Sequence, residues 1–396
     1  MRPLDGIRVL DLTNVLAGPF CCHQLAHLGA EVIKVEAAGR GDLARNLGAD
    51  PALNRAGMGV SFLAQNAGKK SVTVNLKTEA GRELLMRLVT TADVLVENFR
   101  PGVMDRLGVG YETLRAARPE LIYCAISGFG QDGPWVHRPA YDQIIQGASG
   151  VMSITGDADS APLRVGYPVA DTVGGLTAAM AISAALNAPR RGGFIDVSML
   201  ESVIATMGWA VSNWLIAGVE PTANGNENMT SAPSGAFMAA DGLINIAANK
   251  DEQWEILARH LDREDLIAHP DYATREDRKR NRLALKAEIE AALAARPARD
   301  WARELNRLGV PAGAVLSVPE VLAMPQIAER GLMATFPNAP GVGRDISVVR
   351  TGLKIDGEAP AVDTPPPELG ADNAEVYGAL GYTAEDLDRL AAEGAI

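Results

Sequence analysis

Apolar runs alternate with helical segments along the first part of the chain. The strand-like runs are IRVLDL (7–12), EVIKVE (31–36), SVTVNL (71–76), DVLVENF (93–99) and LIYCAISGFG (121–130), and amphipathic stretches such as EAGRELLMRLVTTA (79–92) lie between them. Strands that alternate with helices predict an α/β fold in which parallel strands are joined by right-handed crossovers. Ligands of such sheets bind in the loops after the strands, which here begin near Thr13, Glu36, Asn98 and Gly128.

The pattern changes after NAPRRGGF (187–194), where helical segments lead to a polar loop at TANGNENMTSAPSG (222–235). From there to about residue 318, strands and charged helices predict a compact α+β unit. The Pro-rich stretch GEAPAVDTPPPELG (357–370) is typical of an extended connector. We therefore expect a large domain of residues 1–195, completed by 361–396, and a small domain of residues 225–320. Linkers at 196–224 and 321–360 would join them.

Composition narrows the class of protein. The net charge of −12 provides no basic excess to neutralise phosphates, so nonspecific binding of nucleic acid is not expected. The three cysteines form no disulfide framework, and the N-terminus lacks the regions of a signal peptide. The uncharged run 202–219 contains serine, asparagine and glycine, which fits a buried helix better than a membrane span. We expect a cytoplasmic protein that does not enter the membrane.

Familiar site motifs are missing. The absence of G-x-G-x-x-G disfavours a nicotinamide dinucleotide and hence a dehydrogenase. G-x-S-x-G is absent too, and the five scattered histidines compose no serine triad. In CCHQLAH (21–27), His23 and His27 lie one helical turn apart beside two thiols, but no further ligands follow at a recognisable spacing. Helix packing is the favoured interpretation, and no metal site is predicted.

Basic residues gather in the loops that follow the predicted strands. They are Arg40, Arg45, Lys69, Lys70, Lys77, Arg100 and Arg106. Guanidinium groups pair bidentately with phosphates, so this gathering on an acidic protein indicates an anionic ligand. Solvated surface cations explain the same residues equally well, and their spacing does not separate the two interpretations.

Asp171 is the only charged residue between Arg164 and Arg190, and it heads the segment DTVGGLTAAMAISAAL (171–186). Aspartate is a favoured helix N-cap, and the residues alone favour that interpretation. A carboxylate in apolar surroundings is also poorly solvated, and it can act as a nucleophile toward an activated acyl group.

Several of these segments occur together in one order: PLDGIRVLDLTNVLAGP, LGAEVIKVE, GKKSVTVNLKTEAGRELL, DVLVENFRPGVMDRLG, ISGFGQDGP and VADTVGGLTAAMAISAAL. In combination they resemble the class III CoA transferases, a family that includes formyl-CoA:oxalate CoA-transferase, carnitine CoA-transferases and α-methylacyl-CoA racemases. The resemblance runs from residue 3 to about residue 200, with weaker echoes toward the C-terminus. It implies a large doubly wound, Rossmann-like domain plus a smaller α+β domain, in a homodimer whose chains interlock like linked rings.

The resemblance also implies a reaction. Asp171 would attack the thioester of an acyl-CoA donor, a mixed anhydride and then an aspartyl-CoA thioester would form, and the acceptor acid would reverse the sequence. Acyl-CoA would be a substrate, with no permanently bound cofactor. We expect succinyl-CoA or a similar short acyl-CoA as the donor and a small mono- or dicarboxylic acid as the acceptor. Gly174 and Gly175 would let the acyl-CoA approach closely, and helix-start amides would orient the Asp171 carboxylate.

The CoA-contacting positions of the family map onto loops of this chain, namely Leu16, Ala17, Val74, Asn75, Leu76, Lys77, Asn98, Phe99, Arg100, Arg106, Ala140 and Tyr141. Two cations of the family are missing, because this chain has Ala37 and Pro139 in their places. Arg40, Arg45 or Arg138 is expected to substitute. NGNENMTSAP (224–233) stands in place of the family's glycine-rich loop. A dicarboxylate acceptor needs a second cationic or amide-rich contact, for which Asn226, Asn228 and Arg164 are the candidates.

Two other functions stay open. Racemases of the family pair the aspartate with a histidine, because racemisation needs a base on each side of the α-carbon. Tyr141 stands in that histidine's position here, which favours transfer over racemisation or epimerisation. A non-catalytic CoA-binding protein would bind CoA without leaving a covalent adduct on Asp171.

Overall fold

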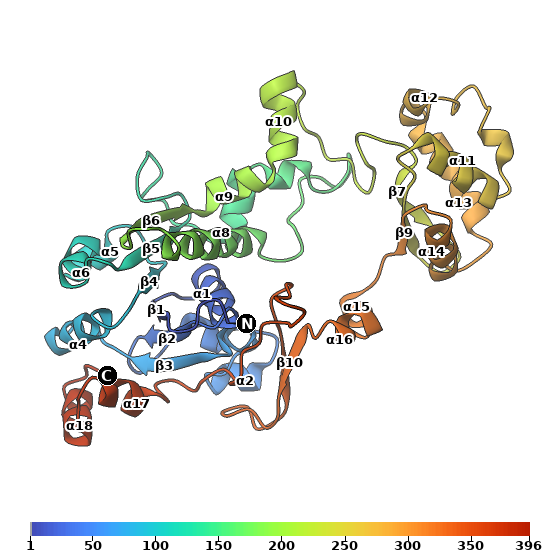
Figure 1. Ribbon diagram of the computed structural model, residues 1–396. Helices are drawn as coiled ribbons and strands as arrows, with labels where there is room; N and C mark the ends of the chain where they lie inside the picture. Colours follow the sequence, from blue (N-terminus) through green and yellow to red (C-terminus); the bar gives the residue numbers. More distant parts are fainter. Residues whose placement is uncertain (1) are drawn as a thin grey trace. The chain divides into compact units, whose positions relative to one another are not determined.

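The computed structural model describes residues 2–396 and divides into two compact units. The first unit contains the residues through Val151 together with Arg164–Val219 and Pro325–Ile396. The second unit contains Met152–Leu163 and Glu220–Met324. Each unit has its own sheet and its own hydrophobic core (Figure 1).

A parallel sheet of six strands forms the centre of the first unit. The strands are β1 (Arg8–Asp11), β2 (Glu31–Glu36), β3 (Lys69–Thr73), β4 (Val94–Glu97), β5 (Ile122–Ser127) and β6 (Gly193–Ser198). Their order in space is β3-β2-β1-β4-β5-β6, and all neighbours pair in parallel. The chain thus winds outward from β1 in one direction and from β4 in the other, which is the doubly wound arrangement. The predicted α/β fold with a parallel sheet is confirmed.

Helices cover both faces of this sheet. The helices α1 (Ala17–His27) and α8 (Val169–Leu186) lie on one face, and α4 (Glu79–Val89), α17 (Asn373–Ala379) and α18 (Ala384–Ala392) lie on the other. The unit also contains α2 (Pro51–Arg55), α3 (Val60–Asn66), α5 (Val103–Arg106), α6 (Tyr111–Ala117), α7 (Asp142–Ala148), α9 (Met199–Thr206), α10 (Gly208–Ala217), α16 (Pro325–Glu329) and the 3₁₀ helix η1 (Leu43–Asn46). A second 3₁₀ helix, η2 (Val151–Ile154), spans the point in the chain where the second unit begins. Alternate strand residues point to opposite faces. Val9 and Val94 therefore pack with α1 and α8, whereas Leu10 and Leu95 pack with α4, α17 and α18.

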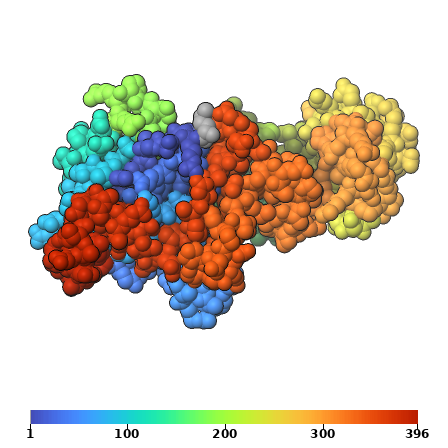
Figure 2. Space-filling model, turned by 60° about the horizontal axis from the view of Figure 1, so that its bottom comes forward, coloured from blue at the N-terminus to red at the C-terminus, as the bar shows by residue number. Residues whose placement is uncertain are grey.

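The C-terminal residues return to the edge of the sheet. The N–H of Asp372 donates to the Ser71 carbonyl at 3.0 Å, and the hydroxyl of Tyr377 donates to the Thr73 carbonyl at 2.7 Å. This segment, red in Figure 2, lies against the blue N-terminal half of the same unit. An antiparallel hairpin of β10 (Met333–Phe336) and β11 (Ile346–Val349) joins the core on the α1 side.

Helix α8 is long and apolar enough to cross a membrane by length and composition alone. It packs instead in the core of the first unit, against α1, α9 and the sheet. A Cβ added at Gly175 would lie 2.5 Å from the carbonyl oxygen of Ala17, and one at Gly174 would lie 2.9 Å from Cγ of Met199. The two glycines therefore make room for protein atoms. The prediction that they open space for an acyl-CoA is wrong.

The second unit is built around a three-stranded antiparallel sheet of β7 (Ser234–Met238), β8 (Leu243–Ala247) and β9 (Ala312–Ala314). Its helices are α11 (Asp251–His260), η3 (Glu264–Leu266), α12 (Arg275–Arg280), α13 (Arg282–Leu293), α14 (Ala298–Arg307) and α15 (Val318–Leu322). The side chains of Trp254, Ile289 and Trp301 are buried in its core. This architecture has the predicted α+β character.

We expect Gly175→Ala to lower the thermal unfolding midpoint. The new methyl meets a backbone carbonyl that cannot rotate away, so α1 and α8 must separate at a cost of about 1–3 kcal/mol. Gly378→Ala in α17 is the matched control, because its Cβ would meet nothing within 4 Å and alanine favours helices. Differential scanning calorimetry measures both variants. A midpoint for Gly175→Ala at or above that of the control would contradict the tight packing of α1 on α8.

Candidate active site

The strand order reverses between β1 and β4, which opens a crevice at the carboxyl ends of these strands. The loops that follow the two strands are fastened to each other. Asn98 Oδ1 accepts the N–H of Asn14 at 2.8 Å, and Asn98 Nδ2 donates to the Asn14 carbonyl at 2.9 Å. Asn14 lines two neighbouring cavities at this edge of the sheet.

The first, which we call the Asp171 cavity, has a volume of about 360 Å³. The loops after β1, β4 and β5, the segment 136–141 and the start of α8 form its wall. The wall includes Asn14, Val15, Leu16, Ala17, Leu43, Asn98, Phe99, Arg100, Ser127, Gly128, Arg138, Pro139, Ala140, Tyr141 and Asp171. Within the described part of the chain, Asp171 is the only carboxyl group of this wall.

The second, the Lys77 cavity, has a volume of about 620 Å³ and lies at the carboxyl ends of β1, β2 and β3. Its wall includes Thr13, Asn14, Glu36, Ala37, Arg40, Leu43, Val74, Asn75, Leu76, Lys77 and Phe99. Asn14, Leu43 and Phe99 line both cavities, so the two share a wall. The two cavities are therefore adjacent along this edge of the sheet.

Asp171 lies in the first turn of α8, and the N-cap residue of that helix is Pro168. The cap is supplied from another helix, because Asp142 Oδ1 in α7 accepts the N–H of Ala170 at 2.9 Å. The predicted N-cap role of Asp171 is therefore wrong. Burial, together with the negative charge of Asp142, raises the pKa of Asp171 to about 7. Its carboxylate is poorly stabilised, which is the opposite of a capping carboxylate.

Asp142 is itself buried and well satisfied. Its Oδ2 accepts from Gln146 Nε2 at 2.7 Å and from the guanidinium of Arg164 at 3.2 Å. Gln146 Oε1 in turn accepts the N–H of Val165 at 2.9 Å. Two side chains of α7 thus fix the segment that leads into Asp171. Sequence reasoning missed Asp142, although it directly follows the predicted contact Tyr141.

Positive side chains stand at both cavities. Arg100 and Arg138 line the Asp171 cavity, and Arg40 and Lys77 line the Lys77 cavity. The guanidinium carbon of Arg138 lies 4.4 Å from the centroid of the Trp135 ring, which orients its plane. On a protein with a net charge of −12, this placement favours an anionic ligand.

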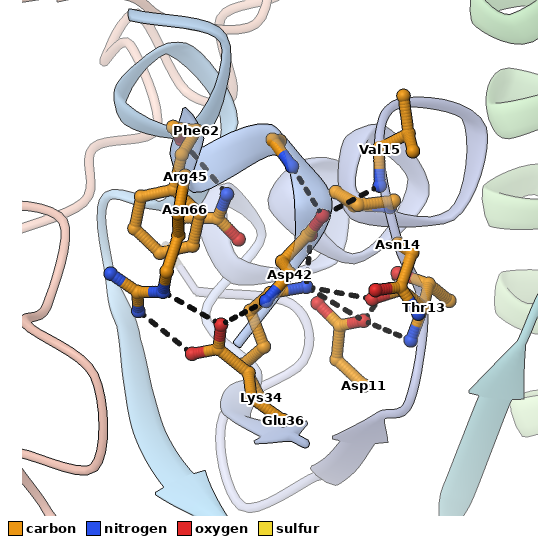
Figure 3. A network of polar contacts seen from close by, with 12 residues as sticks. Asp11, Thr13, Asn14, Val15, Lys34, Glu36, Asp42, Arg45, Phe62 and Asn66 are labelled. Atoms are coloured by element: carbon orange, nitrogen blue, oxygen red, sulfur yellow. Dashed lines mark hydrogen bonds and ion pairs between the residues drawn. The ribbon is translucent and has the colours of Figure 1, made fainter. Parts of the chain in front are cut away.

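Other basic residues of these loops are committed to ion pairs. Arg45 Nη2 contacts Glu36 Oε1 at 2.7 Å and Arg45 Nε contacts Glu36 Oε2 at 2.8 Å, both in the buried network of Figure 3. Lys69 Nζ pairs with Asp11 Oδ2 at 2.8 Å inside the protein, and Lys70 pairs with two surface glutamates. The prediction that Arg45 substitutes for a missing phosphate contact is therefore wrong. Lys69 and Lys70 are likewise no longer candidates for binding an anionic ligand, because both are already paired with carboxylates.

The chain also matches a known family over most of its length. Residues 4–373 match CoA-transferase family III. The chain is a family III CoA-transferase.

Similar proteins and solved structures support the same family for this transferase. Acetyl-CoA:oxalate CoA-transferase from Acetobacter aceti is 42% identical over 335 residues, which cover 84% of this chain and 85% of that protein. Succinyl-CoA:glutarate CoA-transferase from Mus musculus is 36% identical over 400 residues, which cover 100% of this chain and 91% of that protein. A crystal structure of a CAIB/BAIF family protein from Brucella suis matches with a TM-score of 0.83 at 35% identity, and covers 96% of this chain and 99% of that chain. The resemblance read from the sequence is confirmed.

The structure of the transferase brings most of the predicted site residues together. Leu16, Ala17, Asn98, Phe99, Arg100, Ala140 and Tyr141 line the Asp171 cavity, while Val74, Asn75, Leu76 and Lys77 line the Lys77 cavity. Arg106 is exposed at the end of α5 and lines neither. Asn226 and Asn228 belong to the second unit, where Asn228 Oδ1 accepts the N–H of Thr230 at 2.9 Å.

His23 and His27 are buried in α1 of the transferase, with ring centroids 4.3 Å apart in an edge-to-face arrangement. Nδ1 of His23 donates to the Ala67 carbonyl, and Nδ1 of His27 donates to the His23 carbonyl. Burial lowers the pKa of both rings, which keeps them neutral. Across residues 2–396, no group of three or more His, Cys, Asp or Glu side chains is placed to hold a metal ion. Helix packing accounts for this segment.

We expect the Asp171 carboxyl group to titrate near pH 7, and Asp142→Asn to lower that midpoint. The amide keeps an oxygen for the N–H of Ala170 and removes the charge that, after burial, raises the pKa of Asp171. Carbodiimide activates a protonated carboxyl group, so amine labelling of Asp171 followed by peptide mass spectrometry across the neutral range measures the midpoint. Asp388→Asn, exposed on α18, is the control. A midpoint in Asp142→Asn equal to or above that of the wild type would refute this coupling.

Proposed function

We propose that this enzyme moves CoA from a short acyl-CoA to a small carboxylic acid, with Asp171 as the nucleophile. One observation carries the proposal: a single, poorly stabilised carboxyl group lies in a small cavity that shares a wall with a larger, cation-lined one. A carboxylate without strong donors retains its nucleophilicity. A sheltered cavity also limits hydrolysis of the anhydride that such an attack produces.

The proposed reaction balances without a metal or an electron carrier. The Asp171 carboxylate attacks the thioester carbonyl of the donor, which forms a mixed anhydride and expels CoA thiolate. The thiolate attacks the Asp171 carbonyl of the anhydride, which gives an aspartyl-CoA thioester and releases the donor acid. The acceptor carboxylate then attacks this thioester, forms a second anhydride and again expels the thiolate. Attack of the thiolate on the acceptor's acyl carbonyl yields the new acyl-CoA and restores Asp171.

The Lys77 cavity is the candidate site for the nucleotide end of CoA. Arg40 and Lys77 supply cations for its phosphates, and Arg40 is the replacement that the structure favours for the cation missing at Ala37. The pantetheine arm would pass the shared wall at Phe99 to bring the thioester to Asp171.

The names of the relatives suggest which donor and acceptor acids this enzyme uses. One is named for acetyl-CoA and oxalate and another for succinyl-CoA and glutarate, so both named acceptors are dicarboxylates. We infer succinyl-CoA or a similar short acyl-CoA as the donor and a dicarboxylic acid as the acceptor. Arg138, which lines the Asp171 cavity, is the candidate contact for the second carboxylate. The loop that contains Asn226 and Asn228 stays a predicted substrate contact.

We expect wild-type enzyme to transfer CoA from succinyl-CoA to a member of a panel of dicarboxylic acids, and Asp171→Ala to lose all detectable transfer. Hydroxylamine added during turnover should mark Asp171 as a hydroxamate, detected by peptide mass spectrometry. Asp196→Asn is the control, since Asp196 is an exposed aspartate of β6 with a raised pKa that lines neither cavity. Transfer that survives in Asp171→Ala would rule out the mechanism.

Assays on the same wild-type enzyme distinguish a transferase from a racemase and from a non-catalytic CoA-binding protein. A racemase would exchange the α-hydrogen of a branched acyl-CoA in deuterated water without an acceptor acid, and a binding protein would leave Asp171 unmodified. Racemisation is not expected, because Tyr141 lines the cavity where a racemase has its second base. An Asp171 that stays unmodified during incubation with succinyl-CoA would favour the binding protein.

We also propose that the enzyme is a homodimer with interlocked chains. Support comes from α10, in which no residue is buried and Trp209, Trp214, Leu215 and Ile216 are between 56% and 85% exposed. Such a cluster of large apolar side chains on one helix is typical of an interface. A second copy of this chain is the partner that the family resemblance implies.

Light scattering after size exclusion should give twice the chain mass of 41.8 kDa. Linked rings cannot separate without unfolding, so the mass should persist on dilution below the concentrations at which ordinary dimers dissociate. Ile216→Glu should reduce the yield of dimer, whereas Leu283→Glu, which is also exposed but lies in α13 of the second unit, should not. A monomer mass in the wild type, or dissociation on dilution, would contradict interlocking.

A further inference from the structure

Val15 has a backbone conformation that its side chain disfavours. Its φ is +67°, in the left-handed region, where a β-branched residue is a rare outlier. Val15 also lines the Asp171 cavity. Strained residues persist only where their surroundings hold them, and they cluster at functional sites. The groups that hold Val15 are therefore informative.

Four side chains clamp the backbone of residues 13–15. Asp11 accepts the N–H of Thr13, and Lys34 donates to the Thr13 carbonyl. Asn98 binds Asn14, the residue after Thr13, twice: its Oδ1 accepts the Asn14 N–H, and its Nδ2 donates to the Asn14 carbonyl. The fourth, Asp42, accepts the N–H of Val15 itself at 2.9 Å through Oδ1 (Figure 3).

Asp42 also belongs to the loop on the other side of the shared wall. Its Oδ1 accepts the N–H of Ala44 at 2.9 Å and so caps η1, which begins at Leu43. Its Oδ2 is 3.0 Å from Nζ of Lys34, and both side chains are buried. One carboxylate therefore ties the loop after β1 to the loop after β2. Leu43, the next residue, lines both cavities.

The clamp is also connected to Asp171. Helix α1 begins two residues after Val15, and its first residue, Ala17, places its carbonyl against Gly175 of α8. Gly175 lies one helical turn after Asp171. Release of Val15 to negative φ would rotate the peptide unit between Asn14 and Val15. The cavity wall that faces Asp171 would then move.

From this geometry, and resting on the proposed function, we propose that Asp42 is a positioning residue of the acyl-CoA site. It holds Val15 in the left-handed conformation and thereby fixes the wall shared by the two cavities. Asp42 touches no reacting atom in this proposal. Its effect passes through the Val15 backbone and Leu43.

The test uses full-length enzyme and steady-state kinetics with acyl-CoA and acceptor acid varied in turn. Asp42→Ala should raise the KM for acyl-CoA at least about fivefold and leave the KM for the acid within about twofold. Mere loss of folded enzyme would lower kcat and leave both KM values unchanged, and this outcome would overturn the proposal.

Asp50→Ala is the matched control. Asp50 caps α2 through the N–H of Ala52 and pairs with Arg344, so it makes the same kinds of contact as Asp42. Its partners line neither cavity, whereas Val15, the partner of Asp42, lines the Asp171 cavity. Its removal should change neither KM. An equal rise in the acyl-CoA KM of Asp50→Ala would show that the effect is not local, and the proposal would fall.

A double-mutant cycle tests the route through Val15. Glycine adopts positive φ without strain, so in a Val15→Gly background the loss of Asp42 should raise the acyl-CoA KM less than about twofold. Equal effects of Asp42→Ala in the two backgrounds would refute the route.

Asp42→Asn keeps an oxygen for the Val15 N–H and removes an anion from Lys34. Its thermal midpoint should fall while its acyl-CoA KM stays within about twofold of the wild type. A KM raised well beyond that in a folded Asn variant would overturn the proposal even if the Ala variant does not fold.

Calorimetric titration with CoA alone repeats these comparisons without turnover. The dissociation constant of CoA should follow the acyl-CoA KM across the same variants. If the wild type binds CoA and transfers none, the proposed function fails while the role of Asp42 is still decided.

Discussion

Six charges are buried together at the carboxyl edge of the sheet, and the rest of the site depends on their mutual compensation. Asp11, Glu36 and Asp42 face Lys34, Arg45 and Lys69, and all six side chains are almost inaccessible to water. Unpaired, each would be too costly to bury; paired, they fix the loops after β1 and β2 and the start of β3. Burial raises the pKa of Asp11, but Lys34 and Lys69 outweigh it and lower that pKa to about 2.

Asp171 lies at the same edge of the sheet under the opposite conditions. The N–H of Ala170, which could have stabilised a carboxylate there, is taken by Asp142, and the charge of Asp142 opposes ionisation further. The carboxylates of Asp11, Glu36 and Asp42 are thus compensated by buried cations, whereas that of Asp171 is not. The contrast is the one expected if Asp171 is the nucleophile of the proposed reaction and the buried network is its framework.

Much of the fold could be predicted from the sequence, because the pattern that marks a strand or a helix lies within the element itself. EVIKVE coincides with β2 because Val32, Ile33 and Val35 are β-branched and favour a strand, although the buried Lys34 and Glu36 interrupt the apolar pattern. The strand β6 gives no such signal: it begins with glycine, contains Asp196 and is half exposed at the sheet edge. Asp171 could be singled out as a lone charge in a small-residue segment.

The roles that could not be predicted depend on distant partners. Lys69 pairs with Asp11, 58 residues away, and Asp142 accepts the N–H of Ala170, 28 residues away. The sequence shows each charged residue but not the partner that it has in the fold. For the same reason Arg45 resembled a surface cation. The loop residue Asn14 had a positional signal, since it closely follows β1, but its bond to Asn98 appears only in the folded sheet.

The two cavities share part of their lining, and under the proposed function CoA and the acids would occupy them for different lengths of time. Under the proposed function, a carrier anchored in the larger cavity would extend only its reactive end past Asn14, Leu43 and Phe99, while a small acid would need the smaller cavity alone. The leaving acid and the entering acid can then exchange through one chamber while the carrier remains bound. CoA would thus stay bound in the larger cavity throughout the reaction, while the two acids would enter and leave through the smaller one.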